Sequence, residues 1–208
     1  MTNKDKVNKI LKNLSEREIC FVSERNLQVE FAIEAKKEFG ECNIYPEYVF
    51  PDDRSKHIDL IIKQKNKKIA FEFKYIVCKF EYKKNDIDIK LRNQSALPVR
   101  RYNCMTDISR LETLKKDKKI TEGYFILITN DKKFWTKSKE KTIDEDFKFD
   151  KGIIKAKTKN WRKDAGKGTI KGHEKSIIIK NEYKIDFKTF EEYKNKRNGL
   201  FKQLVLKI

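Results

Sequence analysis

Residues 57–75 read HIDLIIKQKNKKIAFEFKY, which is two strongly apolar runs joined by a short polar segment rich in lysine. Each run is interrupted by an acid, Asp59 in the first and Glu72 in the second, and Lys74 follows two positions after Glu72. Residues two apart in a β-strand share a face, so Glu72 and Lys74 point to the same side of their strand. If the two strands pair as neighbours, Asp59 can join that face. The stretch therefore predicts two strands that bring two carboxylates and an ammonium group to one point.

These three groups suit the hydrolysis of a phosphodiester bond with Mg²⁺. Hard divalent cations take oxygen ligands, usually one or two carboxylates, and fill the other positions with water and substrate phosphate. The bound metal makes hydroxide available near neutral pH and stabilises charge on the phosphate. Lys74 could orient or deprotonate the attacking water, or stabilise the phosphate in the transition state.

An alternative interpretation is a solvated strand face that carries an ordinary Glu/Lys pair. Asp59 argues against it, because a charge between Ile58 and Leu60 is costly unless it is paired or bound to a metal. The three residues together therefore favour a functional site, with Asp59, Glu72 and Lys74 as catalytic residues.

The composition indicates one folded domain with a polyanionic partner. The chain has 208 residues, of which 38% are hydrophobic, so it can bury a core. Its net charge of +18, from 50 basic and 32 acidic residues, favours nucleic acid through phosphate contacts and counterion release. The alternative is that the charge serves only solubility in a lysine-rich chain.

Cysteine usage and hydropathy give expectations about metal and location. The four cysteines are widely spaced without a C-x-x-C pair, and the chain has two histidines, so we expect no zinc site. We expect a cytoplasmic protein, because the sequence has neither an apolar N-terminal stretch nor a run long enough to span a membrane.

Hydrophobic periodicity predicts an α/β sandwich with a mixed sheet. The expected elements of the first part are helices at 4–20 and 23–39, strands at 43–50, 57–63, 68–77 and 87–91, a loop at Pro98, a helix opening at 106 or 107, and a strand at 123–129. The expected elements of the rest are short strands at 152–157, 176–179 and 204–208 and a short helix at 187–193. Ser23 is expected to cap the second helix and Gly40 to end it.

This order and the acidic motif resemble the PD-(D/E)XK nuclease superfamily, whose restriction-endonuclease-like fold has an αβββαβ core. Asp59 matches the first acid of the family and residues 72–74 match its (D/E)-x-K, while Ile58 stands where the motif name has proline. The resemblance covers about residues 20–135. It implies a nuclease core with an N-terminal helix over residues 1–135, and a β-rich C-terminal extension over residues 136–208 packed on the same domain. It also implies an endodeoxyribonuclease that uses Mg²⁺, with Mn²⁺ as a substitute.

The family often carries a metal-linked glutamate on the first helix of its core, and in junction-resolving members it lies in an E-R-x-L pattern. Residues 24–27 read ERNL and match that pattern. At about 100° per residue, Glu24 lies between Phe31 and Ala35 on the core-facing side, whereas Glu30 falls well away from it. An ordinary first-turn glutamate, favoured by the helix dipole, is the alternative.

With this glutamate, the expected metal ligands are Asp59, Glu72, Glu24 and the backbone carbonyl of Phe73. Residues 100–112 and 127–131 are also similar to segments of bacterial proteins of restriction-endonuclease type. This similarity implies that residues near the edge of the active site grip the scissile phosphate, namely Gln94, Arg100, Arg101 and Tyr102. For Arg101 and Arg110, a salt bridge to Asp107 or Glu112 is an equal alternative.

The expected partner is DNA, held by lysines and arginines around 79–110 and 155–171, and many relatives act as homodimers. Two other functions stay open. One is a non-catalytic nucleic-acid-binding module that has kept the nuclease fold. The other is an RNA-processing nuclease, which shares every feature of the sequence.

Overall fold

The computed structural model describes residues 1–17, 20–84 and 87–208, without the side chains of residues 53–56 and 84. The described residues form a mixed α/β structure around a six-stranded sheet, which confirms the expected class. The α-helices are α1 (Asn3–Glu16), α2 (Glu24–Phe39), α3 (Leu97–Lys116) and α4 (Lys167–Ile170). The strands of the sheet, in spatial order, are β1 (Asn43–Phe50), β2 (Asp53–Gln64), β3 (Lys67–Ile76), β6 (Glu122–Thr129), β12 (Leu200–Lys207) and β11 (Lys188–Glu192).

The sheet is mixed because β3 and β6 run parallel while its other neighbouring strands pair antiparallel. Antiparallel neighbours can be joined by a tight turn, whereas parallel neighbours need a long crossover. The crossover from β3 to β6 contains α3. Seven of the eight residues of β6 are buried, as expected for a strand covered on both faces.

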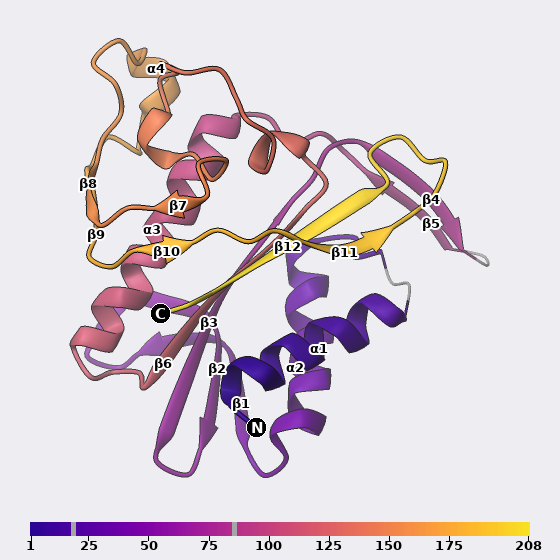
Figure 1. Ribbon diagram of the computed structural model, residues 1–208. Coiled ribbons are helices and arrows are strands. Elements are labelled where there is room, and N and C mark those ends of the chain that lie inside the picture. The colour runs from indigo at the N-terminus through magenta and orange to yellow at the C-terminus, as the bar shows by residue number, and fades with distance from the viewer. Residues whose placement is uncertain (18–19, 85–86) are drawn as a thin grey trace.

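Helices cover both faces of the sheet (Figure 1). On one face, α1 and α2 pack against the odd-numbered residues of β3, and Phe31 of α2 contacts the rings of Phe71 and Phe73. On the other face, α3 packs against the even-numbered residues, with Ile108 and the buried Ala70 in one apolar cluster. Even-numbered β3 side chains therefore point toward α3.

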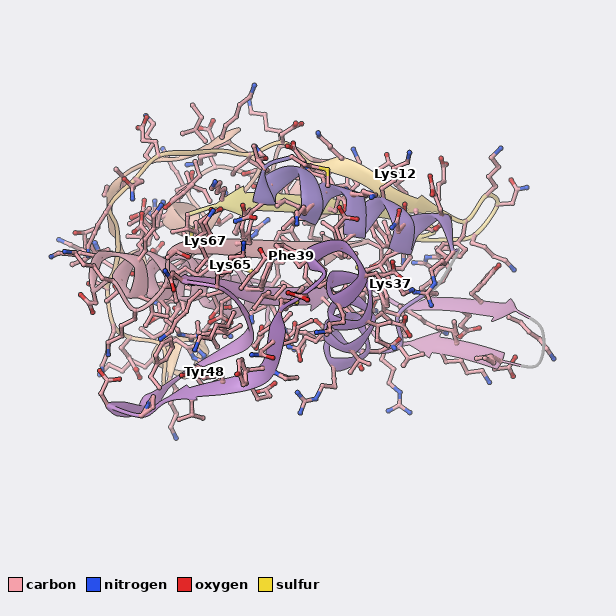
Figure 2. The ribbon with its side chains drawn as sticks, turned by 90° about the horizontal axis from the view of Figure 1, so that it is seen from below. Lys12, Lys37, Phe39, Tyr48, Lys65 and Lys67 are labelled. Carbon is pink, nitrogen blue, oxygen red and sulfur yellow. The ribbon has the colours of Figure 1, made fainter. Side chains whose placement is uncertain are left out.

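Three short two-stranded ribbons complete the structure. They are formed by β4 (Phe80–Lys84) with β5 (Ile87–Leu91), β7 (Ile153–Ile154) with β10 (Tyr183–Lys184), and β8 (Lys157–Lys159) with β9 (Ile177–Ile179). The β4–β5 ribbon follows β3 and extends to one side of the body in both views (Figures 1 and 2). Aromatic packing holds the base of this ribbon, because the ring of Phe80 contacts the rings of Tyr193 and Phe201.

The start of α2 follows the sequence closely. The Ser23 side chain accepts a hydrogen bond from the backbone N–H of Asn26, and the helix ends at Gly40, whose φ of 68° is one that favours glycine. α1 ends at Glu16, and the part of the expected first helix at residues 18–19 lies outside the described residues.

Two expected elements are wrong. α3 begins at Leu97 rather than at 106 or 107, and Pro98 lies in its first turn, where the missing N–H costs nothing. The helix expected at 187–193 is the strand β11, whose backbone pairs with β12. Pairing at the sheet edge therefore decides the structure of that segment.

The remaining sequence expectations concern cysteines and membranes. The thiols of Cys20, Cys42, Cys78 and Cys104 are all free. Among the helices of the described ranges, none combines the length and apolar character needed to cross a bilayer.

Candidate active site

Asp59 and Glu72 lie just past the end of the ladder between β2 and β3. This ladder runs from Gln64 and Lys67 to Leu60 and Phe71, and 59 and 72 are the next positions along the two strands. Farther on, β2 stays in its ladder with β1 and β3 stays in its ladder with β6. The two strands thus separate at Asp59 and Glu72. From there on, the backbone edge of β3 that faces β2 is not paired with that strand.

Side chains occupy this edge of β3 in place of a strand. The backbone N–H of Phe73 donates to Asp59 Oδ2 at 2.7 Å. The ammonium group of Lys74 donates to the carbonyl oxygen of Phe73 at 3.1 Å. Asp59 and Lys74 therefore satisfy backbone groups that β2 would have paired, and the same contacts fix where the two side chains lie.

Glu24 and Gln94 likewise satisfy the backbone groups of Tyr75, two residues farther along β3. The backbone N–H of Tyr75 donates to Glu24 Oε2 at 2.8 Å, and Gln94 Nε2 donates to the carbonyl oxygen of Tyr75 at 3.2 Å. Glu24 is the first residue of α2, directly after the Ser23 cap. Its Oε1 lies 3.9 Å from the Lys74 ammonium group.

Glu30, the other acid weighed for this helix, lies elsewhere. Its carboxylate pairs with Arg17 at 3.2 Å. Of the two glutamates, the structure places Glu24 beside Asp59 and Lys74.

α3 contributes an acid and a base from the face that covers the sheet. Asp107 Oδ2 lies 2.7 Å from the Lys74 ammonium group, and Asp107 Oδ1 lies 3.1 Å from Arg110 Nη2. Arg110 Nη1 also donates to Glu72 Oε1. The salt bridge between Arg110 and Asp107 is the alternative that the sequence offered for Arg110. The same two side chains also contact β3, Asp107 through Lys74 and Arg110 through Glu72.

Sequence reasoning left Asp107 and Arg110 out of the site. The available signal was an acid at a buried position of an otherwise apolar helix face, since Asp107 is 4% exposed. We call Glu24, Asp59, Glu72, Lys74, Asp107 and Arg110 the six-residue cluster.

The cluster is buried at one end and open at the other. Glu72 is 1% exposed, whereas the side chains of Arg110 and Glu24 are 27% and 37% exposed. Solvent therefore reaches the cluster at Glu24 and at Arg110.

Burial and crowding of like charges raise the pKa values of three acids in the cluster. Burial raises the pKa of Glu72 well above its usual value, and the charge of Asp107 adds to this while Arg110 opposes it. Burial likewise raises the pKa values of Glu24 and Asp107, with Lys74 as the main opposing charge. The acids are thus close enough to repel one another.

The pKa values of the two bases are also raised, but by the neighbouring acids and not by burial. Burial by itself lowers the pKa of Lys74, but the charges of Asp107 and Glu24 outweigh burial and raise it above the usual value. The pKa of Arg110 is also raised, because Glu72 and Asp107 outweigh burial. Lys74 is therefore an ammonium ion at neutral pH.

The charge balance of the cluster leaves a deficit of positive charge. Four carboxylates face two cations, so the fully ionised cluster carries −4 + 2 = −2. Within the described ranges, no group of three or more His, Cys, Asp or Glu side chains already surrounds one cation position. Mg²⁺ needs only one or two carboxylates besides water and phosphate. The oxygen donors and the missing charge fit one hard divalent cation.

Two of the residues expected to contact nucleic acid, Arg101 and Tyr102, make their contacts outside this cluster. Arg101 is 3% exposed and pairs with Asp144 at 2.7 Å, not with the expected Asp107 or Glu112. The hydroxyl group of Tyr102 donates to the carbonyl oxygen of Lys175. These contacts speak against a phosphate contact by Arg101 or Tyr102.

Two further expected residues differ in their position. Arg100 is half-buried, and Gln94 is exposed, with its side chain bonded to the edge of β3. Of the four residues expected to grip phosphate, the structure brings Gln94 to the edge of β3 that Glu24 also contacts.

Comparisons of the chain with known protein families, with curated proteins and with solved structures found no match. The geometry and charge of the six-residue cluster are what indicate a function for this chain.

Proposed function

We propose that the protein is a metal-dependent endodeoxyribonuclease that hydrolyses phosphodiester bonds in DNA. One observation carries the proposal: Asp59 and Glu72 lie one position past the end of the β2–β3 ladder, beside Lys74, in a cluster of four carboxylates and two cations. The order α2, β1, β2, β3, α3, β6 supports it, because it matches the αβββαβ order of the PD-(D/E)XK superfamily, with the β4–β5 ribbon as an insertion between β3 and α3.

In this proposal, Asp59 and Glu72 hold Mg²⁺, and the Phe73 carbonyl and Glu24 supply further oxygen donors. The bound ion supplies hydroxide near neutral pH and neutralises charge on the phosphate. The hydrogen bond from Phe73 N–H fixes one oxygen of Asp59, so the orientation of its carboxylate is set by the strand. Glu24 is fixed in the same way by Tyr75 N–H.

Lys74 acts as a hydrogen-bond donor in this proposal. Its raised pKa keeps the amine protonated, so it orients the attacking water and stabilises the phosphate rather than removing a proton. Asp107 holds the ammonium group at 2.7 Å and thereby sets its direction. Asp107 is a positioning residue for Lys74.

The charge of the chain supports a nucleic-acid substrate, since a net charge of +18 favours phosphate contacts. A hollow of about 500 Å³ lies at the base of the β4–β5 ribbon, just past the end of β3, and its lining includes Lys79, Lys196 and Arg197. These three side chains are exposed. They offer phosphate contacts at one hollow, and Lys79 in its lining lies five positions after Lys74 in the sequence.

A substrate panel tests the proposal. Purified protein is incubated with double-stranded, single-stranded and branched DNA and with RNA, in Mg²⁺, in Mn²⁺ and in EDTA. We expect cleavage of DNA in either metal and none in EDTA. Cleavage of RNA alone would favour an RNA-processing nuclease, and binding without any cleavage would favour a non-catalytic module.

A further inference from the structure

Arg110 joins the buried end of the cluster to its open end. Its Nη1 donates to Glu72, which is 1% exposed, and its Nη2 lies 3.1 Å from Asp107. The Arg110 side chain itself is 27% exposed. A guanidinium group on the solvent side thus holds two carboxylates that would otherwise be buried close together.

This contact bears directly on a cation at Glu72. A buried carboxylate is costly unless a positive charge compensates it, and Arg110 supplies that charge. A divalent cation at Glu72 supplies it as well. The two cations repel each other at short range, so each weakens the hold of the other on the same carboxylate.

We propose that Arg110 is the built-in counter-ion of Glu72 and that a divalent cation competes with it for this carboxylate. The inference rests on the proposed nuclease function. Arg110 stabilises Glu72 until the cation binds, and then turns its donors toward the open side while Asp107 retains it. A guanidinium fork there suits a substrate phosphate, because its donors match phosphate oxygens in pairs.

The proposal predicts opposite effects of Arg110→Gln on metal binding and on cleavage. Without the arginine, the cluster loses one positive charge and the cation has no guanidinium competitor at Glu72, so metal affinity rises. Cleavage slows, because the phosphate loses a donor. A purely structural role for Arg110 would weaken both.

Binding of Mn²⁺ measured by electron paramagnetic resonance tests this on the full chain without substrate. We expect Arg110→Gln to bind Mn²⁺ about tenfold more tightly than the wild type, the size of effect that one nearby charge produces at a partly exposed site. Arg110→Lys keeps the positive charge but loses the paired donors of the guanidinium group. We expect its Mn²⁺ affinity to lie between those of the wild type and Arg110→Gln. Circular dichroism establishes that each variant is folded.

Arg25→Gln is the matched control. It removes one positive charge from α2, where Arg25 is 62% exposed and pairs with Glu47 at 2.8 Å. We expect its Mn²⁺ affinity to equal that of the wild type. If both variants bound Mn²⁺ more tightly by the same factor, the cause would be the lower net charge of the protein. That result would overturn the proposed competition between Arg110 and the cation.

The outcomes separate this inference from the proposed function. If the wild type binds Mn²⁺ and Asp59→Asn loses binding, but Arg110→Gln binds no more tightly, the Arg110 inference is overturned and the metal site stands. If the wild type does not bind Mn²⁺, the proposed function and the inference fail together. Should Arg110→Gln not fold, Arg110→Lys decides, and an affinity equal to or weaker than wild type overturns the inference.

Discussion

The ammonium group of Lys74 lies 2.7 Å from the carboxylate of Asp107, which joins a strand to the helix that follows it. Asp107 Oδ1 in turn lies 3.1 Å from Arg110, so the acid fixes both bases of the cluster. Lys74 is thereby held as a cation beside Asp59 and Glu72. The chemistry that we propose depends on that state of charge.

Asp107→Asn is expected to slow cleavage by about 10- to 100-fold, as loss of a supporting partner of a catalytic group commonly does. The amide cannot compensate the charge of Lys74, so the ammonium group loses its orientation. Single-turnover kinetics at saturating DNA measures the effect, which should lie in the cleavage step and not in KM. Asp117→Asn, an exposed residue at the end of α3, serves as the control. A change in KM alone would contradict the positioning role.

Glu24→Gln is expected to lower the cleavage rate about tenfold or more and to raise the Mg²⁺ concentration needed for half-maximal rate. The neutral amide still reaches Tyr75 N–H but offers a weaker ligand to a hard cation. Glu30→Gln, on the same helix but paired with Arg17, should leave the Mg²⁺ dependence unchanged. Equal effects of the two substitutions would show that Glu24 serves only the stability of α2.

Replacing Lys196 and Arg197 by alanine is expected to weaken DNA binding and to reduce its salt dependence. Each lost phosphate contact should lower the slope of log affinity against log salt by about 0.9. The control replaces Lys65 and Lys67, exposed lysines well away from the β4–β5 ribbon in Figure 2. Fluorescence anisotropy across a salt series measures both pairs. A larger loss of slope in the control pair would place the DNA elsewhere.

Lys159→Met is expected to stabilise the protein at neutral pH. Burial, reinforced by the charge of Lys157, lowers the pKa of Lys159 to about 8. The unfolded state therefore binds more protons than the folded state between about pH 8 and pH 10.4, and stability rises with pH across that window. Below pH 8 the stability of the wild type is reduced by the full free-energy cost of burying the charged Lys159.

Thermal unfolding measures this difference. We expect the melting temperature of Lys159→Met to exceed that of the wild type by about 2–4 °C at pH 7, and the gain to shrink toward pH 10. The exposed Lys155 provides the control, Lys155→Met, which should show no such trend. A constant difference at every pH would mean that packing, and not charge, causes the change.

The sequence indicates four residues of the cluster, Glu24 among them, and misses Asp107 and Arg110, for a physical reason. Asp59, Glu72 and Lys74 lie on neighbouring strands, where a period of two residues and a short turn determine which side chains share a face. Asp107 and Arg110 lie on α3, and their contacts depend on the rotation of that helix against the sheet. A local pattern does not determine that rotation.

The same limit explains the errors in the fold. The sequence predicts a loop at Pro98, whereas proline is tolerated in a first helical turn and α3 includes it. It predicts a helix at 187–193, whereas this segment is the edge strand β11, paired with β12. Helix caps are local and predictable, whereas edge-strand pairing is decided by tertiary structure.

Nicking of supercoiled plasmid DNA by the wild type and by Asp59→Asn is the decisive measurement for the proposed nuclease. We expect Mg²⁺-dependent nicking by the wild type, abolished by EDTA, and a loss of nicking in Asp59→Asn with DNA affinity retained. Equal Mg²⁺-dependent nicking by both proteins, or the absence of cleavage by the wild type on every nucleic acid in the panel, would refute a metal-dependent nuclease at Asp59.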